Sequence, residues 1–455
     1  MALKRQRKKL GPAKMLREIQ PDSAGIDVGA MEIYIALPDD HRSPDTVRCF
    51  GTFTRELHEA ARWLQAYNIK AIAMESTGVY WIPIFQILEA YGFDIVLVNA
   101  RHVKNVPGRK TDVQDCQWLQ YLHSVGLLRG SYRPAHDVCA LRALLRHRDS
   151  MVKISSTHVQ HIHKSLTQMN IQIHNVIRDI TGLTGLAIVD AIIAGERNPK
   201  KLAALKHGRI KASDSVLVQS LEGNYLPEHL FTLKQALQSY RHCQEMIGVC
   251  DKEIEAYLTE FESRLDPVET PPPPPRIKKT KPSGNEPDFD LRSHLYRVFG
   301  TDLTQVDGIS VLTAQVLFAE VGPNLSKFST VNHFCSWLGL CPNNKISGGR
   351  ILSAKTKPGS NRAAQALRLA AQALWKSQSV LGHFFRRMRA RHGTPKAITA
   401  TAHKLARIVF HLIKTGKTYD ETVFADQEKL HEQRLERNIR NQAKSLGFQL
   451  VPIEG

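Results

Sequence analysis

Two long stretches of this 455-residue chain carry apolar residues in alternating steps of three and four. In the first, from Val138 to Ile180, eleven of thirteen such positions are apolar; in the second, from Leu230 to Phe261, eight of ten are. This spacing places the apolar side chains along one stripe of a helix, and the stripe must be buried against another helix. The pattern predicts two long coiled-coil helices, antiparallel or paired with another subunit, the first about 65 Å long at 1.5 Å per residue. The segment between them, Thr181 to Leu221, is predicted to form a compact helical cap.

The residues before Pro134 follow a different pattern. Short apolar runs bounded by turn residues predict strands, and longer amphipathic segments predict helices. Thr111 is a suitable N-cap for the last of these helices. The predicted strands cover residues 23–29, 32–37, 46–53, 70–75 and 94–98, and the predicted helices cover residues 57–67, 81–91 and a segment that starts near 111. This part of the chain is therefore predicted to be an α/β unit.

A proline-rich segment separates the heptads from the C-terminal part. Residues 267–288 contain eight of the 22 prolines, five of them consecutive, which is typical of a stiff linker between domains. We expect six parts. They are a basic N-terminal arm (residues 1–20), an α/β catalytic domain (21–133), a coiled-coil and helical insertion (134–264), a proline-rich linker (265–290), a basic and mainly helical domain (291–420), and a helical tail (421–455).

Positive charge is concentrated in two places. The chain carries 62 Lys and Arg against 43 Asp and Glu, a net charge of +19. Residues 321–419 contain 17 Lys and Arg and no Asp or Glu, and the first twenty residues contain seven basic residues and one acid. A solvated protein surface normally mixes both signs, so an acid-free block of this length indicates a surface that binds a polyanion. Nucleic acid is the expected partner, with an affinity that falls steeply as salt rises.

Other classes of protein are disfavoured. No apolar run approaches the roughly 18 residues of a membrane helix, and the basic start of the chain lacks the apolar stretch of a signal peptide. The seven cysteines are scattered without a Cys-x-x-Cys pair. This usage argues against a disulfide scaffold or a structural zinc site and predicts a cytoplasmic protein that does not engage a membrane.

Four acids occupy positions where a metal site can form. Asp27 and Glu75 end two predicted strands, and Asp112 and Asp115 lie three residues apart on one face of a predicted helix. The carboxyl ends of parallel strands meet at one sheet edge, where α/β folds bind ligands. Oxygen ligands suit Mg²⁺ or Mn²⁺, which activate nucleophiles in phosphoryl transfer. Taken singly, each acid is equally explained as a turn residue or a helix N-terminal charge. Together, their strand, strand, helix order predicts an RNase H-like fold.

The motifs around these acids resemble a known family. The chain is similar to insertion-sequence-110 family transposases, also called bridge-RNA-guided recombinases, and to their 1111 subgroup in particular. The resemblance spans most of residues 23–420 and is carried by Gly25–Gly29, Met74–Tyr80, Lys110–Asp115, Ile180–Gly185, Ala194–Arg197, Val306–Ser310, Trp337–Pro342 and Gly359–Arg362. It implies a RuvC-like domain whose four acids hold divalent metal, and a C-terminal transposase (Tnp) domain.

The resemblance also implies a serine nucleophile that forms a phosphoserine intermediate with DNA. Ser347, in Asn343–Arg350, matches its position, and Ser353 and Ser360 are rivals in the same loop. Two glycines after Ser347 permit close approach of a phosphate. Basic residues able to stabilise the developing charge are Lys345, Arg350, Lys355 and Lys357. Further candidate contacts to nucleic acid are Lys110, beside Asp112, and Arg362, Arg386 and Arg387 in the acid-free block.

These observations predict a recombinase that moves an insertion sequence at the bacterial nucleoid. The resemblance implies donor and target DNA, a noncoding bridge RNA and a homodimer or homotetramer as partners. Two alternatives stay open. In the first, the chain is a RuvC-like Holliday-junction endonuclease that uses water as nucleophile, with Ser347 a bystander. In the second, it is a non-catalytic nucleic-acid-binding protein whose acids are structural.

Overall fold

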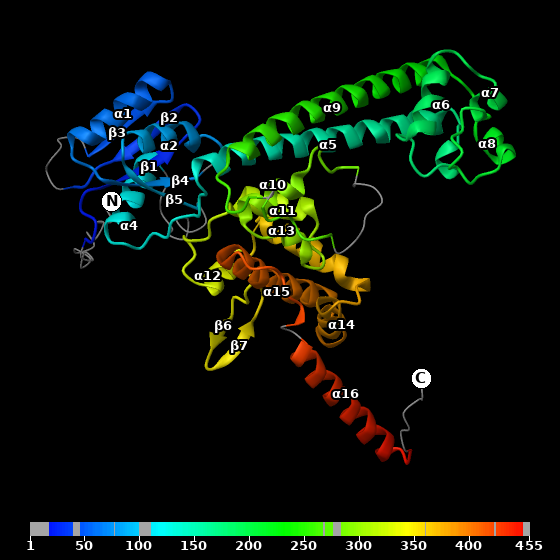
Figure 1. Ribbon diagram of the computed structural model, residues 1–455. Coiled ribbons are helices and arrows are strands. Elements are labelled where there is room, and N and C mark those ends of the chain that lie inside the picture. The colour runs from blue at the N-terminus through cyan, green and yellow to red at the C-terminus, as the bar shows by residue number, and fades with distance from the viewer. Residues whose placement is uncertain are drawn as a thin grey trace, which may run out of the picture. The chain divides into compact units, whose positions relative to one another are not determined.

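The computed structural model describes residues 18–39, 46–76, 78–99, 111–266, 269–275, 284–359, 361–422 and 425–448. Lys110, Ser360 and nearly all of the predicted basic arm lie outside these ranges. The chain divides into two compact units, residues 1–133 and residues 134–455. Figure 1 shows most of the strands gathered near the N-terminus and a mainly helical remainder that carries a small β-hairpin.

The first unit is built on a mixed five-stranded sheet. Its order is β3-β2-β1-β4-β5, with β1 antiparallel to β2 and parallel to β4. β3 is antiparallel to β2, and β5 is parallel to β4. The strands are β1 (Ser23–Val28), β2 (Glu32–Ala36), β3 (Val47–Gly51), β4 (Ala71–Glu75) and β5 (Asp94–Val98). The predicted α/β unit is therefore confirmed, with each strand within a few residues of its predicted range.

Helices cover both faces of this sheet. Helices α1 (Thr54–Ala66) and α2 (Trp81–Ala90) pack their apolar residues on the face that carries Ile26, Ile72 and Met74. Helix α4 (Asp112–Ser124) packs on the other face through Leu119, against Ala73 and Val98. Because successive residues of a strand point to opposite faces, this division fixes which side chains of β1 and β4 lie under α4.

Gly25 lets α4 approach β1 closely. A Cβ atom at residue 25 would lie 2.2 Å from the carbonyl oxygen of Cys116 and 2.3 Å from the backbone nitrogen of Gln120. Across the same contact, Gln120 Nε2 donates to the carbonyl of Ser23 at 3.3 Å. Because residue 25 has no side chain, α4 can pack directly against the strand that carries Asp27.

Two long helices dominate the start of the second unit. Helices α5 (His136–Gln168) and α9 (Pro227–Glu260) lie side by side along their lengths, as Figure 1 shows. Ser165 contacts Thr232 at 3.0 Å, and Arg148, nearer the start of α5, contacts Asp251, nearer the end of α9. The helices are therefore antiparallel, as the heptads allow. Supercoiling and pairing with another subunit remain predictions.

The first long helix is shorter than predicted. It ends at Gln168 and spans about 50 Å at 1.5 Å per residue, since the chain turns at Asn170, a non-glycine residue with φ 53°. The remaining apolar heptad positions, from Met169 to Ile180, pack into the core of the cap. That cap is helical, as predicted, and consists of α6 (Leu183–Ile193), α7 (Pro199–Ala203) and α8 (Asp214–Ser220).

The rest of the second unit is a helical bundle with one small hairpin. Its largest fully buried side chains include Phe299, Phe318, Phe334 and Phe385, which form the core on which the acid-free block folds. Its helices are α10 (Leu291–Phe299), α11 (Val311–Val321), α12 (Val331–Trp337), α13 (Arg362–Ala373), α14 (Val380–His392), α15 (Thr394–Thr415) and α16 (Ala425–Ser445). Within the described ranges, every helix is too short or too polar to cross a bilayer.

The described part of the predicted linker lies against this bundle. Gln305 Nε2 donates to the carbonyl of Pro274 at 3.1 Å, and Arg292 donates to the carbonyl of Pro273. Arg148 on α5 donates to the carbonyl of Asn285 at 3.0 Å. These prolines are therefore fastened to neighbouring helices of the second unit. A domain boundary within residues 265–290 remains a prediction.

Candidate active site and nucleic-acid interface

The first two candidate acids lie on neighbouring parallel strands. Asp27 is near the end of β1, and Glu75 is the last residue of β4. The register pairs Ile26 with Met74, so the next residues, Asp27 and Glu75, follow side by side at the same edge of the sheet. Both alternate with residues that point toward α1 and α2, such as Ile26 and Met74, which directs the two acids to the opposite face, covered by α4.

The other two acids lie in the first turn of α4. Thr111 caps this helix, as predicted: its hydroxyl accepts a hydrogen bond from the backbone N–H of Gln114 at 3.3 Å. Asp112 and Asp115 follow the cap directly. The close contact at Gly25 fixes α4 on β1, so the first turn brings both acids toward the strand ends.

Electrostatics shows that the four acids share one neighbourhood. The pKa of Asp27 is raised from 3.8 to about 6, first by burial and then by the negative charges of Glu75, Asp112 and Asp115. A hydrogen bond from the backbone of Val28 acts in the opposite direction. The acidic edge, as we call these four residues, is thus a cluster of like charges that a bound cation would stabilise.

Four carboxylates are a donor set that fits hard divalent cations such as Mg²⁺ or Mn²⁺. The side chains do not form a closed ligand shell in the present arrangement: over the described ranges, no three His, Cys, Asp or Glu side chains are grouped tightly enough to hold a metal ion. The structure therefore brings the four acids to a common edge without grouping them as a metal site.

Ser347 lies on a β-hairpin that the sequence interpretation treated as a loop. Strand β6 (Lys345–Ser347) pairs with β7 (Arg350–Ser353), and Ser347 is directly opposite Arg350. Gly348 and Gly349 form the turn with φ values of 54° and 75°. Two left-handed residues are what a tight two-residue hairpin turn requires, so the Gly-Gly pair was the available signal. Ser347 is exposed near the tip.

The predicted basic contacts have different surroundings. Lys345, Arg350, Lys355 and Lys357 are exposed on the hairpin or just beyond it. In contrast, a guanidinium nitrogen of Arg362 lies 3.7 Å from a carboxylate oxygen of Asp149 on α5. Arg386 donates to the carbonyls of Ser377 and Trp375, and it therefore helps to fix the turn before α14. Arg387 is half-buried on α14, and Lys110 lies outside the described residues.

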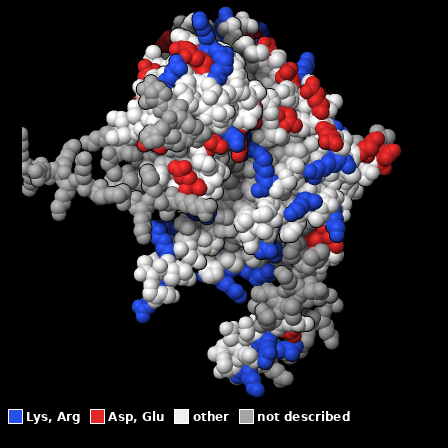
Figure 2. All heavy atoms as spheres, turned by 90° about the vertical axis from the view of Figure 1, so that its left-hand side faces the viewer, with Lys and Arg blue, Asp and Glu red and all other residues white. Residues whose placement is uncertain are grey.

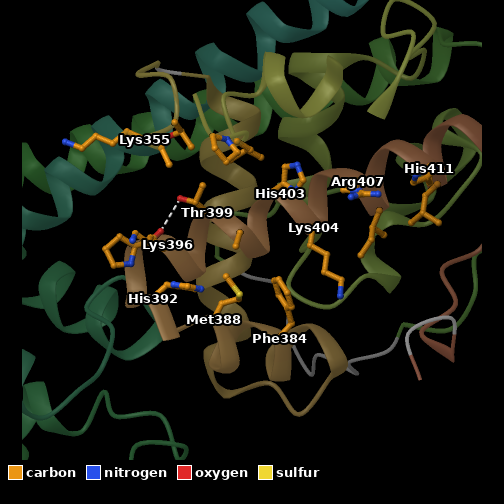
Figure 3. A pocket seen from close by; sticks show the side chains of 18 of the residues that line it. Lys355, Phe384, Met388, His392, Lys396, Thr399, His403, Lys404, Arg407 and His411 are labelled. Atoms are coloured by element: carbon orange, nitrogen blue, oxygen red, sulfur yellow. Dashed lines mark hydrogen bonds between the residues drawn. The ribbon is translucent and has the colours of Figure 1, made fainter. Parts of the chain in front are cut away.

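A large basic groove was missed at the sequence level. It has a volume of about 1990 Å³ and runs along α15, bounded by α14, by the base of the hairpin and by residues 417–420 (Figure 3). Among the described residues that line it, Asp420 is the sole acid. The basic lining residues are Lys355, His392, Lys396, His403, Lys404, Arg407, His411 and Lys417. Several of these recur on one face of α15 at helical spacing, which was the signal that could have revealed the groove.

Aromatic and apolar groups interrupt this basic lining. Lys404 lies over the ring of Phe384 at 4.7 Å, and Met388 lies nearby on α14 (Figure 3). Burial and the charge of Arg407 lower the pKa of His403 below its ordinary value. The groove thus offers cations for phosphates and ring or apolar surfaces for bases, the combination found in nucleic-acid-binding channels.

The molecular surface repeats the unequal distribution of charge. On the face shown in Figure 2, Asp and Glu are interspersed among Lys and Arg in the upper part, whereas Lys and Arg predominate below.

Comparisons with known proteins match two separate segments of the chain. A family model described as "Transposase" matches residues 24–171, which contain the acidic edge. A model described as "Transposase IS116/IS110/IS902 family" matches residues 300–386, which contain the hairpin. The chain is also 32% identical over 128 residues to the "Insertion element IS110 uncharacterized 43.6 kDa protein" of Streptomyces coelicolor. That match covers 28% of this chain and 31% of the relative, so the chain spans about a third of it. The chain is therefore similar to transposases in its N-terminal part and to the IS116/IS110/IS902 family of transposases in its C-terminal part.

Proposed function

We propose that this protein is a metal-dependent DNA recombinase that cleaves, exchanges and rejoins strands to move an insertion sequence. The observation that carries the proposal is the acidic edge: the carboxyl of Asp27 lies within the electrostatic influence of Glu75, Asp112 and Asp115. The sheet order β3-β2-β1-β4-β5, with β2 antiparallel, supports the RuvC-like assignment. The family match at both domains supports DNA as the substrate.

In this proposal the acidic edge binds Mg²⁺ or Mn²⁺ through Asp27, Glu75, Asp112 and Asp115. When bound, such an ion activates an attacking oxygen and stabilises the leaving oxygen of a phosphodiester. The chain's own contribution is to hold the four carboxylates on two strand ends and one helix turn. Gly25 permits the close approach of the same helix, at Cys116 and Gln120, to the strand that carries Asp27.

Ser347 is the proposed nucleophile. Its Oγ gives up its proton and forms a bond to phosphorus, while the bond from phosphorus to one deoxyribose oxygen breaks and that oxygen takes up a proton. The reverse reaction with a second strand rejoins the DNA and frees the serine. Arg350, directly opposite Ser347, is placed to stabilise the negative charge on the phosphate oxygens.

The groove beside the hairpin is the proposed track for nucleic acid. Its lining includes Leu352–Thr356, at the end of the hairpin and just beyond it, and continues along α15. Donor and target DNA, a bridge RNA typical of the 1111 subgroup, and a second or further copies of this chain complete the assembly. We place the assembly at the bacterial nucleoid.

A substitution at Ser347 tests the proposal. Ser347→Ala should abolish strand exchange between donor and target DNA in the presence of the element's RNA, and it should remove the protein–DNA adduct seen by denaturing electrophoresis. Ser353→Ala, on the other strand of the same hairpin, is the matched control and should retain the adduct. Cleavage that persists in Ser347→Ala and depends on Mg²⁺ would instead identify the water-using Holliday-junction endonuclease. A protein that binds DNA without cutting or exchanging strands at any Mg²⁺ concentration, and whose DNA binding is unchanged by Asp27→Asn, would identify the non-catalytic alternative.

A further inference from the structure

The β6–β7 hairpin exposes three large apolar side chains. Ile346 is 62% exposed, Ile351 61% and Leu352 70%. Single exposed apolar residues are common on proteins, but three within a ribbon of two short strands require an explanation. Among the described residues, no helix packs on the hairpin closely enough to bury them, and the hairpin extends from the helical bundle in Figure 1.

The register divides this ribbon into two faces. Ile346 pairs with Ile351, and the adjacent pair is Ser347 with Arg350. Directly opposed residues point to the same face and successive residues to opposite faces. The isoleucine pair therefore occupies one face, and the candidate nucleophile with its arginine occupies the other. Lys345 pairs with Ser353, so Leu352 is left as the extra residue of a bulge.

The tip of the ribbon is slender. Gly348 and Gly349 both adopt left-handed φ values, and a Cβ atom at either residue would meet open space. Two turn residues without side chains give the hairpin its narrowest cross-section one residue beyond Ser347. Such a tip can enter a space that a larger turn could not.

The charges around the ribbon indicate its occupant. Lys345 and Arg350 lie on the ribbon, Lys355 and Lys357 follow it, and no Asp or Glu occurs between residues 321 and 419. A protein partner would need acids to match these cations and an apolar patch to cover the isoleucines. DNA offers both in one body, as phosphates on its backbone and apolar surfaces on its bases.

We propose that the hairpin is a strand-opening wedge, which enters duplex DNA beside the scissile phosphate and unstacks the neighbouring base pair with Ile346 and Ile351. The opposite face then presents Ser347 and Arg350 to the backbone of the strand that is cut. This inference rests on the proposed function and adds how the scissile strand is separated from its complement. Apolar side chains inserted between base steps are an established way for proteins to deform DNA.

The test uses the full-length protein with Ser347→Ala, which binds DNA without attacking it. The probe is a duplex spanning one end of the insertion sequence, with 2-aminopurine next to the scissile position, bound together with the element's RNA. Unstacking should raise the fluorescence of 2-aminopurine several-fold on binding. Adding Ile346→Thr and Ile351→Thr keeps β-branched residues in both strands and should remove most of that rise, with affinity changed less than about threefold.

Two matched variants define the specificity of this effect. Ile346→Val with Ile351→Val keeps the apolar face and should retain most of the fluorescence rise. Leu369→Ala removes an apolar side chain of similar exposure (59%) on α13 and should leave the rise unchanged. In the protein with Ser347 intact, the threonine variant should cut a matched duplex at least tenfold more slowly. It should regain its rate on a duplex with mismatches at the cut site, since that DNA is already open.

Other results would overturn the wedge. An undiminished fluorescence rise in the threonine variant would show that the isoleucines do not open DNA. Loss of self-association by that variant in the absence of DNA would identify the apolar face as a protein interface. Cleavage that survives Ser347→Ala would refute the serine mechanism and leave the fluorescence result intact, so the two ideas fail separately.

Discussion

Asp27 is the acid in the first unit whose pKa is affected by all the other members of the acidic edge. Its carboxyl is partly withdrawn from water and surrounded by three other acids, and both effects raise its pKa to about 6. A protonated Asp27 is therefore favoured in the folded protein relative to the unfolded chain. At neutral pH the folded protein holds a charge there at a cost in stability, which is the usual condition of a site arranged for a cation.

Because the charge on Asp27 costs stability, Asp27→Asn should raise the free energy of unfolding measured in EDTA, by an amount that depends on pH. The folded pKa of about 6 exceeds the unfolded value of 3.8, so the folded state binds more protons and loses stability as pH rises through this interval. At pH 7.5 the variant should be more stable than the wild type by about 2 kcal/mol, allowing for partial solvent screening. At pH 3.5 the difference should fall to a few tenths of a kcal/mol, because the group is then protonated in both states. Urea unfolding at the two pH values measures it.

The matched control is Asp39→Asn, at an exposed carboxylate of the same unit. It should change the free energy of unfolding little at either pH. An equal gain from Asp27→Asn at both pH values would contradict the electrostatic explanation and indicate a packing effect.

Metal binding provides a second test at the residue scale. Mn²⁺ or Mg²⁺ at about 100 times its dissociation constant should stabilise the wild type by about 2.7 kcal/mol and raise its melting temperature. Glu75→Gln keeps the size of the side chain and removes one anionic ligand, so the rise should be reduced or abolished. The same shift in Glu75→Gln as in the wild type would exclude Glu75 as a ligand.

At the scale of elements, the helix pair shows how polar residues interrupt an apolar seam. The two polar positions of the first heptad series, Arg148 and Ser155, face the two polar positions of the second, Asp251 and Gln244. Arg148 and Asp251 are both buried, and Asp251 also accepts from the backbone N–H of Asp288 at 3.3 Å. Matching polar positions in a seam specify one alignment of two helices over others shifted along the axis.

Breaking this buried pair should be costly. Arg148→Met leaves the Asp251 carboxylate buried without its cation and should lower the free energy of unfolding by about 3–5 kcal/mol. Adding Asp251→Leu should recover most of the loss, because the unpaired charge is then gone. Arg241→Met breaks the exposed pair with Asp190 and should cost less than about 1 kcal/mol. Chemical denaturation of the four proteins measures the difference, and equal losses from Arg148→Met and Arg241→Met would contradict it.

Elements with a strong local signal were predictable from the sequence. The strands around Asp27 and Glu75, the N-cap at Thr111 and the antiparallel helix pair all follow from local chemistry or periodicity. The end of the first long helix was missed, because the apolar repeat continues past Gln168 while a left-handed Asn170 turns the chain. The hairpin around Ser347 was missed because a strand of three residues has too little length to show alternation.

At the scale of the whole molecule, the sequence shows where the positive charge lies along the chain but not the shape of the surface that carries it. An acid-free block predicts a polyanion-binding surface, and its linear position is read directly from the sequence. The groove exists only because α14, α15 and the base of the hairpin meet in the fold. Contacts between segments that are distant in the sequence produce no periodic pattern of residues. The set of residues that lines the groove could therefore not be predicted from the sequence.

The groove predicts a change in the salt dependence of binding. Lys396→Gln and Arg407→Gln should each weaken binding to unrelated DNA sequences to a similar extent, and should each lower the slope of log K against log salt by about 1. Lys234→Gln, at an exposed residue of α9, should leave the slope unchanged. Fluorescence anisotropy over a salt series measures the slopes. A slope that is the same for all four proteins would remove the groove from the nucleic-acid interface.

The acidic edge is formed by one short stretch of the chain, and under the proposed function this has a consequence for populations of insertion sequences. All four acids and the close contact at Gly25 lie within Ser23–Ser124. If the protein is the recombinase proposed above, one small lesion in this stretch would stop strand cutting while α15 and its basic residues stay intact. A copy damaged in this way would still occupy the ends of sister elements. Decayed relatives in the same genome would then compete with active ones and slow their spread.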